Sequence, residues 1–319
     1  MNQTLPTPPV LFLVFKRPTL TKLVFEEIRK AQPRQLFIGA DGPRENNHDD
    51  ADKVNEVREI VQNVDWDCEV KTFFQKKNVG SKLAESSAIN YFFENVNAGI
   101  ILEDDCLPNQ FFFKFCAELL DRYHDDNRIM HISGNNFQFG RTIGNESYYF
   151  SNFNYAWGWA TWKRAWAHYD VDMKNYPKFK DQKQIKNTFS SKRIQTYLTK
   201  IFDSVYANKV DCWDYQWSFS ILSQNGLCIC PNKNLVSNIG FGSSGQNCID
   251  PNTAIANIKT HELTNMTHPN IILPNHEADI YAFNKCNPYP MCLVKLQKLI
   301  PPRFLPILKK LWNFTHFKF

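Results

Sequence analysis

Residues 98–105 read AGIILEDD, a short apolar run that passes directly into three acidic residues. An unbroken apolar run of this length is typical of a strand buried on both faces, as strands are in a parallel sheet. The run VLFLVF at residues 10–15 has the same character and ends at Lys16, Arg17 and Pro18. The sequence therefore predicts two buried strands that carry charged side chains at their carboxyl ends.

Helices and further strands alternate in the segment between these two runs. Apolar spacing predicts helices over residues 20–30, 53–62 and 81–95, and apolar runs predict strands over 35–40 and 68–74. This order indicates an α/β fold of the Rossmann-like kind, with an open, mixed but mainly parallel sheet that is flanked by helices.

The rest of the chain is less regular, and its composition changes near the end. We expect one domain over residues 1–270, made of a first half (1–125) and an irregular second half (126–270), and a C-terminal extension over 271–319. Of the 37 lysines and arginines, seven lie between Ile280 and Phe319, where there is no Asp or Glu. This basic, apolar tail is expected either to lie as an amphipathic helix on an anionic membrane surface or to pack back on the body.

Charge and hydropathy exclude several classes of protein. Without the tail, 30 of the 37 lysines and arginines remain against 32 acidic residues, which is not the basic balance of a general nucleic-acid binder. No apolar run approaches the roughly 18 residues that span a bilayer, and the start MNQTLPTPPV has no secretory leader pattern. We therefore expect a cytoplasmic protein that binds no nucleic acid. If the tail contacts a membrane, we expect it to lie on the inner face of that membrane.

Charged side chains follow three of the predicted strands. Arg17, Asp41 and the cluster Glu103, Asp104 and Asp105 come directly after apolar runs, and ligands bind at the carboxyl ends of parallel strands. Three adjacent carboxylates repel one another unless a cation lies among them. Carboxylate oxygens suit Mg²⁺ or Mn²⁺, and the phosphate groups of a substrate complete the coordination shell of such an ion. The cluster thus predicts a metal and diphosphate site, with a solvated turn or a helix N-cap as the alternative.

A single acid, Asp214, lies between Trp213 and Trp217. A carboxylate flanked by indole rings is partly desolvated, which raises its pKa toward that of a useful general base. The alternative is an N-cap for the helix predicted over residues 215–223.

Two common catalytic motifs are missing from the chain. Neither GxxxxGK[ST] nor GxSxG occurs, which disfavours a P-loop kinase and an α/β-hydrolase. The glycine-rich loop GFGSSG at residues 240–245 allows close approach to a ligand, but a flexible turn explains it equally well.

Eight motifs together resemble those of GT-A glycosyltransferases that use nucleotide sugars, most closely N-acetylglucosaminyltransferase I and its bacterial, family 2-like relatives. The resemblance covers roughly residues 10–247. In chain order the motifs are LFLVFKRP, FIGADGP, NVGSKLAESSAINYFF, GIILEDDCLPNQFFFKF, MHISGNNF, YAWGWATWKRAW, CWDYQW and NIGFGSSGQN.

The resemblance implies a nucleotide-sugar donor, usually a UDP-sugar such as UDP-GlcNAc. It implies that residues 1–125 bind the donor and residues 126–270 the acceptor. Arg17 would contact the phosphate or ribose region, Asp41 the nucleobase, and Lys82 would lie in a helix near the nucleotide. Gln246 and Asn247 would lie where a mobile loop closes over the donor.

The resemblance also implies a Mn²⁺ or Mg²⁺ cofactor and an inverting mechanism. Glu103, Asp104 and Asp105 match the DxD-like motif, in which Asp104 meets the sugar or ribose and Asp105 is the direct metal ligand. Asp214 matches the catalytic base, which deprotonates the acceptor hydroxyl for in-line attack.

We therefore expect an inverting, metal-dependent glycosyltransferase that acts on a saccharide or glycolipid acceptor, in surface polysaccharide or lipooligosaccharide synthesis. Trp157, Trp159 and Trp213 are candidates for stacking on sugar rings, with ordinary aromatic core as the alternative. The second candidate is a sugar-phosphate nucleotidylyltransferase, although residues 15–18 stand where that class of enzyme has a glycine-rich loop. The third candidate is a catalytically inactive protein that binds glycans or membranes.

Overall fold

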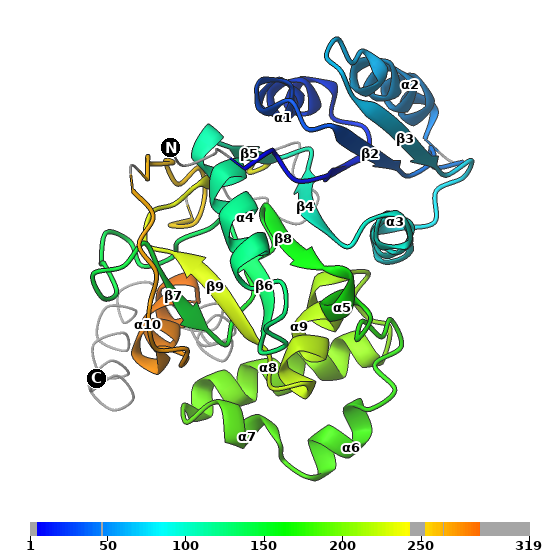
Figure 1. Cartoon of the computed structure of the whole chain (residues 1–319). Coiled ribbons are helices and arrows are strands. Elements are labelled where there is room, and N and C mark those ends of the chain that lie inside the picture. The colour runs from blue at the N-terminus through cyan, green and yellow to red at the C-terminus, as the bar shows by residue number, and fades with distance from the viewer. Residues whose placement is uncertain (1–4, 46, 243–252, 264, 288–319) are drawn as a thin grey trace, which may run out of the picture.

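One sheet of eight strands forms the centre of the molecule (Figure 1). The computed structural model describes residues 5–45, 47–242, 253–263 and 265–287. The strands are β1 (Val10–Val14), β2 (Gln35–Ala40), β3 (Glu69–Phe74), β4 (Ala98–Glu103), β5 (Cys106–Pro108), β6 (Ile129–Ser133), β7 (Tyr148–Ser151), β8 (Trp159–Trp162), β9 (Leu227–Pro231) and β10 (Val236–Asn238). In the sheet they follow the order β3-β2-β1-β4-β8-β6-β9-β7, and β5 pairs with β10 separately.

Most strands of the sheet run in one direction. The pairs β1 with β2, β1 with β4, β2 with β3 and β6 with β9 are parallel. Only β8 and β7 run antiparallel to their neighbours. The expected open, mixed but mainly parallel sheet of a Rossmann-like α/β fold is confirmed.

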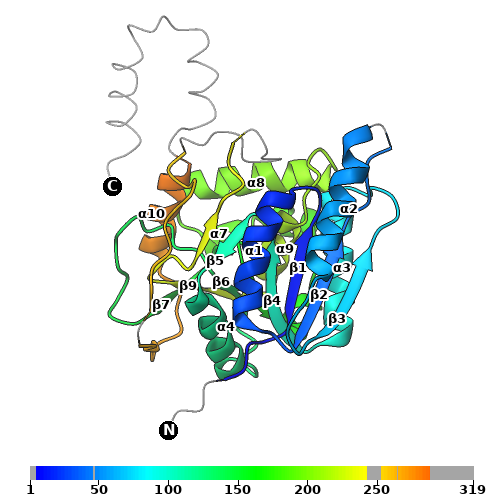
Figure 2. The same cartoon turned by 90° about the horizontal axis from the view of Figure 1, so that it is seen from above.

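Helices connect the strands and cover both faces of the sheet (Figures 1 and 2). They are α1 (Pro18–Ala31), α2 (His48–Gln62), α3 (Ser81–Asn95), α4 (Gln110–Arg122), α5 (Lys163–Trp166), α6 (Tyr176–Asp181), α7 (Ile185–Thr188), α8 (Lys192–Tyr206), α9 (Asp214–Ser223) and α10 (His276–Cys286). The boundaries expected for the first helices were close. The helix expected from residue 20 begins at Pro18. Proline suits the first turn of a helix, because the backbone amides there have no hydrogen-bond acceptor within the helix.

The strand β1 shows why its sequence is apolar without alternation. Val10, Phe12 and Val14 pack in one core cluster with α1, α2 and α4. Leu11 and Leu13 pack in a second cluster with α3 and α9 on the opposite face. Successive strand residues point to opposite faces, so a strand covered on both faces must be apolar throughout.

The second half of the chain adds four strands to the same sheet. The aromatic segment around residues 148–166 supplies β7 and β8, and β8 inserts antiparallel between β4 and β6. These two strands were not expected from the sequence, because the aromatic residues of the segment lack a clear period. The single sheet therefore joins both halves, which places the ends of β4 and the helix α9 around one site.

The helix α10 packs against this body. Asp279 accepts hydrogen bonds from Ser151 Oγ at 2.5 Å and from Asn152 N at 3.0 Å, which ties α10 to the end of β7. The domain boundary expected near residue 270 stays a prediction, and the tail over residues 288–319 lies outside the described residues. No helix among the described residues is long and apolar enough to cross a bilayer.

Candidate functional site

The strand order reverses between β1 and β4. From β1 the chain continues to β2 and β3 on one side, and β4 pairs with the other side of β1. In an open α/β sheet such a point leaves a crevice beyond the carboxyl ends of the strands, where ligands bind. A cavity of about 1460 Å³ lies there. Its wall contains six of the nine predicted site residues: Arg17, Asp41, Glu103, Asp104, Asp105 and Asp214.

The acid cluster at the end of β4 meets Arg17 from the end of β1. The guanidinium of Arg17 donates to Asp105 Oδ2 at 2.9 Å and forms an ion pair with Asp104. Burial raises the pKa of Glu103 and of Asp104, and for Asp104 the charge of Arg17 acts in the opposite direction. One guanidinium thus faces three carboxylates, which leaves the cluster short of positive charge.

The oxygen atoms of this cluster fit a hard divalent ion. Carboxylate oxygens of Glu103 and Asp105 lie, with Cys106 Sγ, within 4.8 Å of one another. Burial raises the pKa of the Cys106 thiol, so the sulfur stays protonated and suits such an ion poorly. Asp104 Oδ2 is buried without a hydrogen-bond partner among the described residues, although buried polar atoms normally have one. Glu103 and Asp105 would therefore hold Mn²⁺ or Mg²⁺, with Asp104 beside them.

A second strand pair supports Asp105 from behind. The amide of Ile239 donates to the carbonyl of Asp105 at 2.8 Å, where β10 runs alongside β5. A Cβ added to Gly240 would lie 2.3 Å from Asp105 Oδ2, so only glycine leaves this carboxylate in place. The start of the glycine-rich loop therefore packs directly on the candidate metal ligand. Residues 243–245 of that loop lie outside the described residues.

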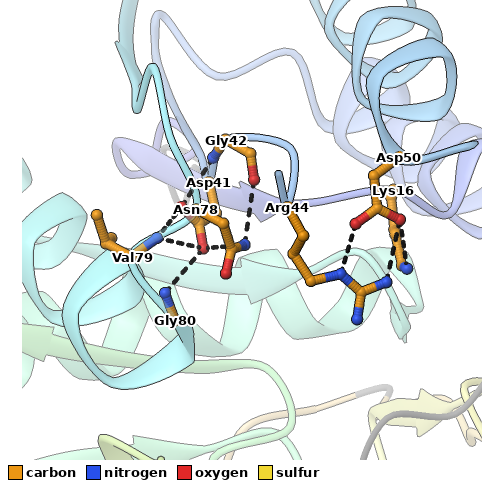
Figure 3. A network of polar contacts seen from close by, with 8 residues as sticks. All are labelled: Lys16, Asp41, Gly42, Arg44, Asp50, Asn78, Val79 and Gly80. Atoms are coloured by element: carbon orange, nitrogen blue, oxygen red, sulfur yellow. Dashed lines mark hydrogen bonds and ion pairs between the residues drawn. The ribbon is translucent and has the colours of Figure 1, made fainter. Parts of the chain in front are cut away.

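The carboxylate of Asp41 is surrounded by donors of the chain itself (Figure 3). It accepts hydrogen bonds from the amides of Gly42 at 2.7 Å, Val79 at 3.0 Å and Gly80 at 3.2 Å, and from Asn78 Nδ2 at 2.7 Å. Burial raises the pKa of Asp41, while these backbone amides lower it. In this structure Asp41 holds the segment before α3, so its contact with a nucleobase stays a prediction.

A second carboxylate takes the next two amides at the start of α3. Asp211 accepts hydrogen bonds from Ser81 N and Lys82 N, both at 3.1 Å. Four consecutive amides, from residue 79 to residue 82, are therefore bound by two aspartates that lie 170 positions apart in the chain. Because Asp211 lies three residues before Asp214, this contact fixes the segment that leads into α9 against α3.

Asp214 opens α9 and faces the same cavity. The N-cap position belongs to Trp213, so Asp214 is not the capping residue that the alternative interpretation required. Burial raises the pKa of Asp214, against the opposing effect of the backbone amides of Asp214 and Tyr215. Asp214 forms no ion pair with any described residue. The raised pKa predicted from its tryptophan neighbours is confirmed in direction.

Two acids of the cavity wall were not predicted from the sequence, Asp211 and Glu85. Glu85 lies in the second turn of α3. Burial raises the pKa of Glu85, as do the charges of Asp214 and Asp104. Small and polar residues surround Glu85 in the sequence, and no apolar stripe shows which way it points. An isolated acid among small residues was the one available signal.

One of the three candidate tryptophans, Trp159, belongs to the aromatic core and does not line the cavity. Trp159 is fully buried and stacks on His131 and Trp213, with ring centroids 5.0 and 5.4 Å apart. Burial lowers the pKa of His131 to about 3, so this core histidine is neutral and accepts a hydrogen bond from Trp217 Nε1. Trp157 and Trp213 line the cavity. Trp159 is therefore a core residue, as the alternative interpretation held, and stacking on a sugar stays a prediction for the other two.

Lys82 does not line the cavity, and its Nζ donates to Asn208 Oδ1 at 2.9 Å. Gln246 and Asn247 lie outside the described residues. A role in donor binding stays a prediction for all three.

Comparison with known proteins gives limited information. No protein-family model matches the chain, and no curated protein matches it. Among solved structures, HddC from Yersinia pseudotuberculosis is similar over 49% of this chain and 77% of its own, with 8% identity and a TM-score of 0.29. HddC complexed with GMP-PN is similar over the same shares, with 10% identity and a TM-score of 0.30. A UDP-glucose pyrophosphorylase complexed with UDP-glucose is similar over 45% of this chain and 62% of its own, with 11% identity and a TM-score of 0.26.

Proposed function

We propose that this protein is an inverting, metal-dependent glycosyltransferase that moves a sugar from a nucleoside diphosphate sugar to a hydroxyl group of a saccharide or glycolipid. The observation that carries the proposal is the pairing of two carboxylate sites in one cavity. The cluster at the end of β4 supplies oxygen donors for a metal ion. Asp214 supplies a separate, half-buried carboxylate that forms no ion pair with a described cation.

These two sites match the two needs of sugar transfer to a neutral hydroxyl. Asp214 accepts the hydroxyl proton as the acceptor oxygen attacks the anomeric carbon, and the bond from that carbon to the diphosphate breaks. Attack on the face opposite the leaving group inverts the configuration. A bound Mn²⁺ or Mg²⁺ neutralises charge on the departing diphosphate. Arg17 lies at the same edge and holds the acid cluster in place.

A sugar-phosphate nucleotidylyltransferase is the second candidate. A pyrophosphorylase is among the similar structures, and by name those comparisons favour this candidate, although TM-scores of this size do not decide between the two. The chemistry of the cavity favours glycosyl transfer. A sugar phosphate is already an anion, so it needs cations around it rather than a base. Among the described residues, seven acids and four cations line the cavity, and Lys16, Arg17 and Arg44 are already paired with aspartates.

The test compares both activities in one preparation. The protein is incubated with Mn²⁺ and a panel of UDP-, GDP- and CMP-sugars, and released nucleotide is measured by mass spectrometry. We expect slow hydrolysis of at least one donor, abolished by EDTA. A parallel reaction with UTP and sugar 1-phosphates is expected to release no pyrophosphate, and pyrophosphate release there would establish the second candidate instead.

Variants connect the activity to the acid cluster. Asp105→Asn is expected to abolish metal-dependent hydrolysis, because it removes a charged oxygen donor. Asp52→Asn, on the exposed surface of α2, is the matched control and should behave as wild type. Equal activity in both variants would remove the metal assignment. Contact of the tail with an anionic membrane is a separate proposal, which binding to vesicles that contain phosphatidylglycerol would test.

A further inference from the structure

Glu85 lines the same cavity as the two carboxylate sites. With Ser81 and Ala84 it forms the face of α3 that lines the cavity wall. The charges of Asp214 and of Asp104 both act on Glu85. Among the charged neighbours of Glu103, Glu85 acts most strongly. Glu85 is therefore close to both the candidate base and the candidate metal ligands.

Two donors of the chain bind the carboxyl group of Glu85. Ser81 Oγ, one turn earlier in the same helix, donates at 2.8 Å, and Trp213 forms a second side-chain hydrogen bond with it. No described cation forms an ion pair with Glu85. A carboxyl group that is partly removed from water is costly without a charge partner. The half-buried carboxyl group lines the cavity, where a polar group that enters can bind it.

The proposed reaction determines what lies beside Glu85. The leaving diphosphate lies at the Glu103–Asp105 cluster, and the acceptor hydroxyl lies at Asp214. In-line displacement requires the anomeric carbon between these two oxygens, so the transferred sugar ring occupies the space between the two sites. Glu85 borders that space, and Ala84 beside it leaves room for the ring.

We infer that Glu85 accepts hydrogen bonds from hydroxyl groups of the transferred sugar and selects the donor by them. This inference rests on the proposed function and deepens it, because it assigns donor specificity to a particular side chain. The carboxyl group of Glu85 offers two oxygen atoms to neighbouring ring hydroxyl groups in either protonation state, whereas a glutamine offers one oxygen and an NH2 group. The position of the hydroxyl groups on the ring, and not the nucleotide, is then what Glu85 distinguishes.

The experiment measures binding and needs no acceptor. Affinities of UDP, UDP-glucose, UDP-galactose and UDP-N-acetylglucosamine are determined by isothermal titration calorimetry with Mn²⁺ present. The proteins are wild type, Glu85→Gln and Glu85→Ala. Glu94→Gln, exposed near the end of the same helix, is the matched control. Thermal unfolding confirms that each variant is folded, and the nearly isosteric glutamine keeps the test valid if alanine destabilises α3.

The expected result is a loss confined to the sugar. Both Glu85 variants should bind UDP within twofold of wild type, lose roughly tenfold in affinity for the preferred UDP-sugar, and show a weaker preference among the three sugars. Wild-type preference in both variants would overturn the role of Glu85 and leave the glycosyltransferase proposal standing. The same titrations are made with GDP, GDP-glucose and GDP-mannose, and wild-type protein that binds neither nucleotide nor any of these sugars would overturn both.

Discussion

The contact between Gly240 and Asp105 allows a sharp test of the metal site by one added methyl group. In Gly240→Ala the new Cβ would lie 2.3 Å from Asp105 Oδ2 and 2.8 Å from Asp105 Cβ. Ordinary contact requires the two groups to separate by about 1 Å. The backbone at this point resists movement, because Ile239 N and Gly240 N are both hydrogen-bonded, to Asp105 O and Asn238 Oδ1. The carboxylate of Asp105 is therefore expected to move.

A shift of this size should damage metal binding more than stability. Disturbing a group that supports a metal ligand costs roughly 10- to 100-fold in metal affinity, and a misplacement of about 1 Å costs roughly 100-fold in rate. Overpacking costs about 1–3 kcal/mol in the free energy of unfolding. Mn²⁺ affinity is measured by calorimetry in the presence of UDP, and donor hydrolysis by nucleotide release.

Gly226→Ala provides a control with the same overlap in a different place. Its Cβ would lie 2.3 Å from Met130 Sδ in the core beneath β6. We expect Gly226→Ala to lower stability and keep wild-type Mn²⁺ affinity, whereas Gly240→Ala loses affinity. If Gly240→Ala is folded and binds Mn²⁺ as tightly as wild type, Asp105 is not a metal ligand and the reasoning fails.

Three further predictions concern single aspartates. Asp214→Asn should reduce transfer by roughly 10²- to 10⁴-fold with donor affinity unchanged. For the wild type, kcat/KM should rise with pH through an inflection above the ordinary pKa of an aspartate, because burial raises the pKa of Asp214. The variant should lack this inflection. Asp50→Asn should lower the free energy of unfolding by roughly 2 kcal/mol at pH 7, because Asp50 is buried and bound by Lys16 and by the more exposed Arg44. These partners lower the pKa of Asp50. In urea unfolding, the difference in the free energy of unfolding between wild type and variant should therefore be complete above pH ~4 and shrink as the pH falls below that value. Asp211→Ala should cost about 1 kcal/mol in the same assay, as the loss of a helix cap does, and an unchanged value would show that its bonds to the start of α3 contribute nothing.

The first half of the fold could be predicted because each local signal there is decisive. Strands buried on both faces must be apolar throughout, and charged residues at their ends mark the ligand edge of the sheet. The expected strands over 35–40 and 98–102 match β2 and β4 within one residue. The same logic predicted that Arg17 and the Glu103–Asp105 cluster lie at this edge, and in the structure Arg17 forms ion pairs with Asp104 and Asp105 there.

What the sequence could not supply are contacts between distant segments. The insertion of β8 between β4 and β6 depends on pairing across some 60 residues, and its aromatic sequence serves a strand or a core loop equally. Asp41 was correctly placed at a strand end, but three of its four donors come from residues 78–80, and nothing in the sequence around Asp41 shows that they bind it. Glu85 was missed because α3 has small residues on several faces, so its sequence does not show which side chains face the cavity.

The start of α3 gives a physical reason for metal dependence. A helix N-terminus beside the strand ends of an α/β sheet is a common phosphate site, because its free amides and dipole attract anions. Here the amides of residues 79–82 are already bound by Asp41 and Asp211. A diphosphate in this cavity must then find its positive charge elsewhere. Three of the four cations that the structure describes in the cavity wall are already paired with aspartates, which leaves Lys53. Under the proposed function, a divalent ion at Glu103 and Asp105 would supply the further positive charge that a diphosphate needs.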